Sequence, residues 1–141
     1  MDFYMDRLAE FHRAFGHHVE SLPVAMVPAK VKDLRMRLMR EELQELEKAM
    51  MEEDLVGIAD GLADLLYVVF GTAVSYGMPM DYVFSLVHTA NMAKLGLDGK
   101  PLMDAGGKTI KPPGWKAPDD GIKDLLERVQ NWYREKHGRT S

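Results

Sequence analysis

Apolar residues recur along this chain at helical spacing and divide it into five segments. Glycine, proline and aspartate lie near most of the segment ends, where helices commonly begin or end. The pattern predicts helices at about 2–15, 29–53, 54–76, 80–95 and 118–136. A loop rich in lysine, glycine and proline precedes the last helix, and its DGK and GGK stretches predict turns with at most a short hairpin between them. We therefore predict an all-α protein.

Five acids of the second and third segments lie in the wrong place for a solvated helix face: Glu41, Glu42, Glu45, Asp60 and Asp64. At about 100° per residue, two of the glutamates fall in line with the apolar stripe of their helix, and Glu42 borders it. The two aspartates are the only formal charges between residues 55 and 74, and their spacing of four places them on one face. Because a helix that is apolar all round is normally buried, we expect these acids inside the protein.

An unpaired carboxylate is costly to bury, so such groups protonate, pair with a cation or bind a metal. Oxygen-only ligands favour a hard divalent cation, and we expect Mg²⁺, with Mn²⁺ as a possible substitute. The alternative is a structural network of salt bridges to Arg35 and Arg37, although two arginines do not balance five acids.

The composition narrows the function further. The 141 residues fit one domain, 1–141, and the net charge of −4 argues against a nucleic-acid-binding protein. No cysteine is present, which excludes thiolate metal sites and disulfides. The first residues are charged and amphipathic rather than a leader, and two aspartates within the apolar stretch 55–74 argue against a membrane span. We expect a cytoplasmic protein that binds neither nucleic acid nor membranes.

A second set of residues predicts phosphate binding near the loop at 96–118. The loop carries several lysines and few acids, and long loops in compact domains are often functional. Asn91 and Lys94 lie three residues apart near the end of the fourth helix, so they would project together towards the loop. Trp115 can stack on a base or serve as a packing residue. The candidate substrate-binding residues are Asn91, Lys94, Lys108, Lys111 and Trp115.

These motifs in this order resemble a known superfamily. EExxE at 41–45, the acidic helix at 60–73, NMAK at 91–94 and the DGK, GK and KPPGW elements of the loop are similar to the all-α nucleoside triphosphate (NTP) pyrophosphohydrolases, and to their MazG-like group most of all. The superfamily includes MazG, the dimeric dUTPases and phosphoribosyl-ATP pyrophosphohydrolase. The resemblance implies a MazG-like helical bundle that forms dimers or tetramers and uses Mg²⁺.

The resemblance also implies roles for the acids. Glu42 and Glu45 match an ExxE motif, and Asp64 matches the aspartate of a second motif, ExxD, in which Gly61 replaces the glutamate. Asp60 is the candidate replacement, so the expected metal ligands are Glu42, Glu45, Asp60 and Asp64. Glu41 or Glu42 is the expected catalytic base.

The sequence therefore predicts a Mg²⁺-dependent pyrophosphohydrolase that converts dUTP or a non-canonical nucleotide to the monophosphate and pyrophosphate. Because Gly61 departs from the second motif, an alternative is a non-catalytic, oligomeric helical protein that binds nucleotide or metal or serves as an interaction module.

Overall fold

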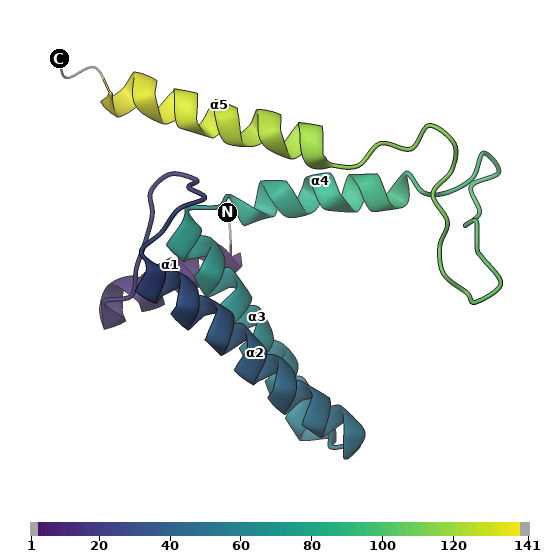
Figure 1. Ribbon diagram of the computed structural model, residues 1–141, viewed down its shortest axis with the longest axis horizontal. Helices are drawn as coiled ribbons and strands as arrows, with labels where there is room; N and C mark the ends of the chain where they lie inside the picture. Colours follow the sequence, from purple (N-terminus) through teal and green to yellow (C-terminus); the bar gives the residue numbers. More distant parts are fainter. Residues whose placement is uncertain (1–2, 139–141) are drawn as a thin grey trace. The chain divides into compact units, whose positions relative to one another are not determined.

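A computed structural model describes residues 3–138 of the chain (Figure 1). Its helices are α1 (Phe3–Phe15), α2 (Ala29–Met51), α3 (Leu55–Tyr76), α4 (Met80–Met92) and α5 (Asp119–His137). Within the described residues, β pairing is limited to two isolated antiparallel bridges in the loop before α5. The all-α prediction is confirmed, and the predicted helices lie close to the observed ones. The largest difference is at α4, which ends at Met92 rather than near residue 95.

The chain forms two compact units, which divide between Met80 and Asp81. We describe each by itself, as the N-terminal unit (described residues 3–80) and the C-terminal unit (81–138). Because two compact units can belong to one domain, the prediction of a single domain for residues 1–141 stays a prediction.

In the N-terminal unit, α3 packs against both α1 and α2. A short turn joins α2 to α3, and within it Glu53 has the left-handed φ of 54°. Asp54 then caps α3, because its Oδ1 accepts a hydrogen bond from the Gly57 amide at 3.1 Å, as its position before the helix predicts. Two helices joined by so short a turn run antiparallel, which brings the acids of α2 opposite those of α3.

Two glycines on α3 allow its neighbours to come close. A Cβ at Gly61 would lie 3.1 Å from the Leu46 Cα of α2. A Cβ at Gly71 would lie 2.5 Å from Nη2 of Arg35 and 2.9 Å from Nε2 of His12. The buried apolar residues of this unit are Leu8, Val27, Leu46, Ala49, Ala73 and Val74. The core is therefore built on close contact with the α3 backbone as well as on large apolar side chains.

Three polar residues are also buried in the N-terminal unit: His12, Arg35 and Ser75. The His12 Nδ1 lies 3.0 Å from the backbone carbonyl of His18, and the Ser75 hydroxyl donates to the same carbonyl at 2.9 Å. These contacts fix the segment after α1 against α3, because a buried polar group is stable only when its hydrogen bonds are made.

By length and composition alone, α3 could cross a membrane. Core helices of soluble proteins can have the same length and composition. Here α3 carries Asp60 and Asp64 and packs against two other helices, although only a small part of its apolar stretch is buried in the isolated chain.

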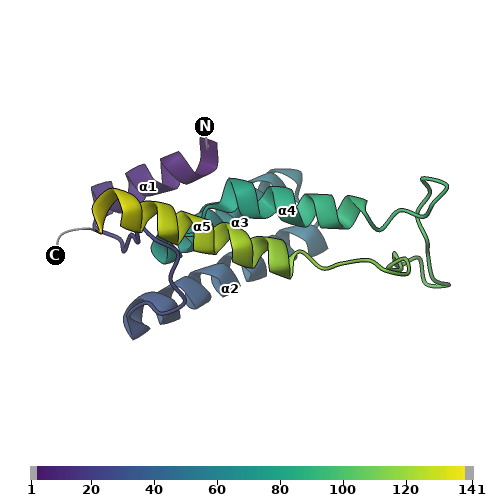
Figure 2. The same cartoon turned by 90° about the horizontal axis from the view of Figure 1, so that it is seen from above.

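In the C-terminal unit, α4 and α5 run antiparallel, and the loop between them extends beyond their ends (Figures 1 and 2). The predicted DGK and GGK turns are present, with positive φ at Gly99 and Gly107. Asp98 Oδ1 accepts a hydrogen bond from the Lys100 amide, and Asp104 Oδ1 accepts from the amides of Gly106 and Lys108. Bridges between Leu95 and Pro101 and between Met103 and Thr109 close the two turns. Local hydrogen bonds thus hold a loop that has little buried surface.

Candidate metal and substrate site

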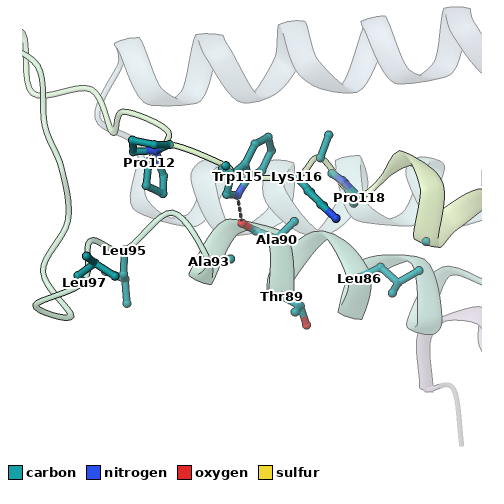
Figure 3. A pocket seen from close by; sticks show the side chains of 14 residues that line it. Leu86, Thr89, Ala90, Ala93, Leu95, Leu97, Pro112, Trp115, Lys116 and Pro118 are labelled. Carbon is teal, nitrogen blue, oxygen red and sulfur yellow. Dashed lines mark hydrogen bonds between the residues drawn. The ribbon is translucent and has the colours of Figure 1, made fainter.

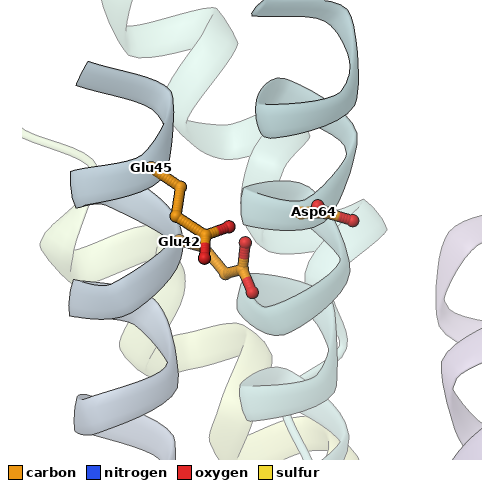
Figure 4. Close-up of side chains that lie close together, drawn as sticks. All are labelled: Glu42, Glu45 and Asp64. Carbon is orange, nitrogen blue, oxygen red and sulfur yellow. The ribbon is translucent and has the colours of Figure 1, made fainter. Parts of the chain in front are cut away.

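Three of the predicted acids, Glu42 and Glu45 of α2 and Asp64 of α3, lie close together (Figure 4). One carboxylate oxygen from each of Glu42, Glu45 and Asp64 lies within 4.8 Å of the other two. Two oxygens on opposite sides of a Mg²⁺ ion are about 4.2 Å apart, so small side-chain rotations suffice to bring all three around one cation. We call these residues the acid cluster.

Glu42 and Asp64 are half-buried, whereas Glu41, Glu45 and Asp60 are exposed, so the expectation that all five acids lie inside the protein is wrong for these three. Among the described residues, no lysine or arginine lies within ion-pair distance of the acid cluster. Oε2 of Glu42 is buried and has no hydrogen-bond partner among the described residues. Partial desolvation raises the pKa of Glu42, and the nearby charges of Glu45 and Asp64 raise it further. Desolvation also raises the pKa of Asp64, followed by the effects of Asp60 and Glu45. An unpartnered buried oxygen beside two further carboxylates fits a bound divalent cation, because a cation would neutralise all three.

The arginines do not form the salt-bridge network that was the structural alternative. Arg35 is buried and donates to the carbonyl of Val68 at 2.9 Å and to Oγ1 of Thr72 at 3.2 Å. Arg37 pairs with Glu41 at 3.8 Å, and both side chains are exposed. Neither arginine therefore neutralises the acid cluster. Sequence reasoning missed the role of Arg35, which holds α2 to α3 one helical turn beyond Asp64.

Gly61, which stands where the ExxD motif has a glutamate, lies in close contact with α2. Gly61 is buried against Leu46, and the short distance from its would-be Cβ to the α2 backbone leaves no room for a larger side chain without movement of α2. Asp60 is exposed and lies outside the acid cluster, but its carboxyl acts on that of Asp64. It also lines a shallow groove with Glu45 and Lys48. Its role as a metal ligand stays a prediction.

The predicted substrate-binding residues belong to the C-terminal unit. Trp115 is fixed there by a 2.7 Å hydrogen bond from its Nε1 to the carbonyl of Ala90. The ammonium groups of Lys94 and Lys111 lie 5.3 and 5.0 Å from the centre of the indole ring, within cation–π range. Asn91 is the residue after Ala90 and is exposed. Lys108 belongs to the turn formed by Asp104. The structure thus gathers Lys94, Lys111 and Trp115.

Comparison with solved structures identifies the class of protein. A crystal structure from Exiguobacterium sp. 255-15, provisionally named an NTP pyrophosphohydrolase, is similar to this chain with a TM-score of 0.56 and 27% sequence identity. The similarity covers 94% of this chain and 98% of that one. The all-α fold therefore has a counterpart in a structure that is provisionally named an NTP pyrophosphohydrolase.

The sequence profile of the family described as phosphoribosyl-ATP pyrophosphohydrolase matches residues 8–91. This chain belongs to that family, within the MazG-like NTP pyrophosphohydrolase superfamily, and the resemblance inferred from its motifs is confirmed. The matched range contains the whole acid cluster, whereas Lys94, the loop and α5 lie outside it.

The chain is also similar in sequence to uncharacterized protein L479 of Acanthamoeba polyphaga mimivirus, with 37% identity over 130 residues. The alignment covers 89% of this chain and 49% of the viral protein, so the chain spans about half the length of the curated relative that it matches.

Proposed function

We propose that this protein is a divalent-metal-dependent NTP pyrophosphohydrolase that converts an NTP or dNTP to the monophosphate and pyrophosphate. The observation that supports this most is the acid cluster itself, in which one oxygen from each of three carboxylates lies within 4.8 Å of the other two and Oε2 of Glu42 is buried without a partner among the described residues. Membership of the pyrophosphohydrolase family supports the same reaction.

Glu42, Glu45 and Asp64 would hold Mg²⁺ or Mn²⁺. Asp60, which lies four residues before Asp64 on α3, would assist them. A divalent cation bound there would offset the negative charge on the phosphate oxygens and polarise the phosphoanhydride. The acids alone would repel a polyphosphate, so substrate affinity should depend on the cation.

In the proposed reaction, water attacks phosphorus, the α–β anhydride bond breaks and pyrophosphate leaves. Glu42 would accept the proton of the attacking water through a carboxylate oxygen that does not bind the cation. Glu41 is a weaker candidate, since Arg37 pairs with it on the exposed side of α2. Asn91, Lys94 and Lys108 would bind phosphate, and Lys111 and Trp115 would bind other parts of the substrate.

The substrate class is best tested by pyrophosphate release over a panel of nucleotides that includes dUTP, the four common dNTPs and oxidised or deaminated forms. We expect release only with Mg²⁺ or Mn²⁺ and fastest for dUTP or a non-canonical nucleotide. Equal rates in EDTA would contradict the assignment of a metal-dependent reaction.

A second function, metal or nucleotide binding without turnover, is favoured by one observation. Gly61 stands where the family motif has a glutamate, and a Cβ there would lie 3.1 Å from the Leu46 Cα, so a glutamate would require α2 to shift by a few tenths of an ångström. In that case Mg²⁺ with nucleotide would still raise the melting temperature, because a ligand that binds only the folded state stabilises it. Pyrophosphate release would be absent. An unchanged melting temperature would instead favour a purely structural interaction module.

We also propose that the protein is a cytoplasmic homodimer or homotetramer. Large apolar residues are exposed on α3 of the isolated chain, among them Leu55, Val56, Leu62 and Leu66. Patches of this kind on a helix mark interaction surfaces. Light scattering coupled to size-exclusion chromatography gives the mass, and a monomer at micromolar concentration would contradict the proposal.

A further inference from the structure

The C-terminal unit contains a cavity of about 620 Å³ beside Trp115 (Figure 3). It lies between the last turns of α4, the segment 112–118 and the first turn of α5. Sites for small molecules are typically about 300–1,000 Å³ in volume, so the cavity has room for a nucleoside. The apolar part of its wall consists of Leu86, Ala90, Ala93, Leu95, Leu97, Pro112, Pro113, Ala117 and Pro118.

Trp115 forms the aromatic wall of this cavity. Its Nε1 donor is already used by the Ala90 carbonyl, so the indole has a fixed orientation and offers a ligand its ring surface rather than a hydrogen bond (Figure 3). A fixed aromatic ring in an apolar cavity suits a flat ring, because stacking needs no particular pattern of donors and acceptors.

The charges around the cavity are positive. Lys116 is part of the wall, no acidic residue lines it, and the ammonium groups of Lys94 and Lys111 lie over the Trp115 ring, 5.3 and 5.0 Å from its centre. A ring that stacks on Trp115 would displace an ammonium group from the face that it uses. Among the described residues, none of these lysines lies within ion-pair distance of a carboxylate. A ligand with a flat apolar part and a negative group therefore matches the cavity in both shape and charge.

We propose that this cavity binds the base and sugar of a nucleoside phosphate, with the base against Trp115 and the phosphate near the lysines. The choice of a nucleotide as ligand rests on the proposed function. Most of the residues that line the cavity lie beyond the matched family range of 8–91.

The chain offers a direct probe, because it contains only two tryptophans, Trp115 and Trp132. The exposed Trp132 can be replaced by phenylalanine, which leaves Trp115 as the sole indole. We expect saturable quenching of its fluorescence when dUMP is added to the Trp132→Phe protein in EDTA, with dCMP, dTMP, dAMP and dGMP as comparisons. Deoxyribose 5-phosphate and inorganic pyrophosphate, which lack a base, should bind at least tenfold more weakly.

Two leucine substitutions distinguish a specific effect on the cavity from a general effect of an added side chain. Ala93→Leu adds a side chain to the cavity wall, whereas Ser85→Leu adds the same side chain to an exposed position on α4 that does not line it. We expect Ala93→Leu to weaken dUMP binding at least tenfold and Ser85→Leu to leave it within twofold, at equal melting temperatures. Equal quenching by pyrophosphate and dUMP, no saturable signal with any nucleotide, or equal affinity of the two variants would each overturn the proposal.

The binding experiment and the turnover assay test the cavity site and the proposed reaction separately. If nucleotides quench Trp115 in EDTA but pyrophosphate is never released with Mg²⁺, the cavity site is supported and the proposed reaction fails. If pyrophosphate is released with Mg²⁺ but no nucleotide quenches Trp115 in a saturable way, the reaction is supported and the cavity site fails.

Discussion

The two units of this protein hold their side chains in different ways. In the N-terminal unit, buried groups such as Arg35 and His12 make hydrogen bonds between segments distant in sequence, and α2 touches the α3 backbone at Gly61. In the C-terminal unit, Ala90 is the one buried residue among those described, and hydrogen bonds within single turns hold much of the loop.

This difference matches the tasks proposed for the two units. Oxygens that bind one cation must be held within a fraction of an ångström, which packed helices achieve and loops do not. Recognition of nucleotides tolerates more movement, and a loop of glycine, lysine and proline can adapt to its ligand. The following predictions test whether the N-terminal unit is the rigid part and the C-terminal unit the adaptable one.

The largest effect is expected from loss of a cluster carboxylate. Glu45→Gln or Asp64→Asn should lower pyrophosphate release at least about 100-fold, because each removes a metal ligand. Glu47→Gln, on the exposed side of the same helix, is the control and should retain near-normal release. A normal rate for Asp64→Asn would exclude it as a ligand.

Asp64→Asn also tests whether the charge of this carboxylate destabilises the metal-free protein. The pKa of Asp64 is higher in the folded protein than its ordinary value, so its ionisation destabilises the fold as pH rises through the interval between the two values. Asp64→Asn should therefore melt at the same or a higher temperature than wild type at pH 7 in EDTA. A clearly lower melting temperature would show that the carboxylate makes stabilising contacts.

A matched pair of glycine substitutions compares the rigidity of the two units. Gly71→Ala places a Cβ against the buried Arg35 and His12 side chains and should destabilise the protein by about 1–3 kcal/mol, the usual cost of overpacking. Gly121→Ala in α5 meets only Leu86, at 3.6 Å, and should stabilise the protein by up to about 1 kcal/mol through helix propensity. Urea unfolding measures both, and equal effects would remove the distinction between the units.

The pH dependence of stability should report on His12. Burial lowers the pKa of this histidine, and the charges of Arg35, His17 and His18 lower it further, against an opposing hydrogen bond to the His18 carbonyl. The contribution of neutral His12 to the stability of the fold is therefore present above the unfolded pKa of about 6.5. This contribution is lost as pH falls towards the lower pKa of His12 in the folded protein. We expect the melting temperature to fall between pH 7 and pH 5.

Two variants identify the residue responsible. His12→Asn keeps a donor for the His18 carbonyl but cannot titrate, so its melting temperature should depend less on pH than that of wild type. The exposed His88→Asn is the control and should keep the wild-type slope. Identical slopes for wild type and His12→Asn would exclude this histidine as the cause.

The smallest effect is expected at Trp115. Trp115→Phe removes the hydrogen bond to the Ala90 carbonyl and should destabilise the C-terminal unit by about 0.5–1.5 kcal/mol. Trp132→Phe, at an exposed position, should change stability less. Amide hydrogen exchange over α4 measures the local change, and exchange that is faster in Trp132→Phe than in Trp115→Phe would contradict the role of this hydrogen bond.

The sequence by itself determined the helices, the caps and the identity of the acids. These depend on local signals: Asp54 caps α3 because its side chain reaches an amide three residues away, and Gly77 ends α3 with a left-handed φ of 68°. The placement of Glu42, Glu45 and Asp64 on facing sides of two helices followed from their helical spacing and the short connection between α2 and α3.

Only the tertiary structure decided which charges meet and how closely α2 approaches Gly61. Spacing alone left Arg35 a possible partner for the acids, whereas packing buries it against Val68 and Thr72. The close contact at Gly61 also depends on another helix, because a Cβ there would lie 3.1 Å from the Leu46 Cα of α2. Distances between residues remote in the chain depend on how the helices pack, and helical periodicity contains no information on that distance.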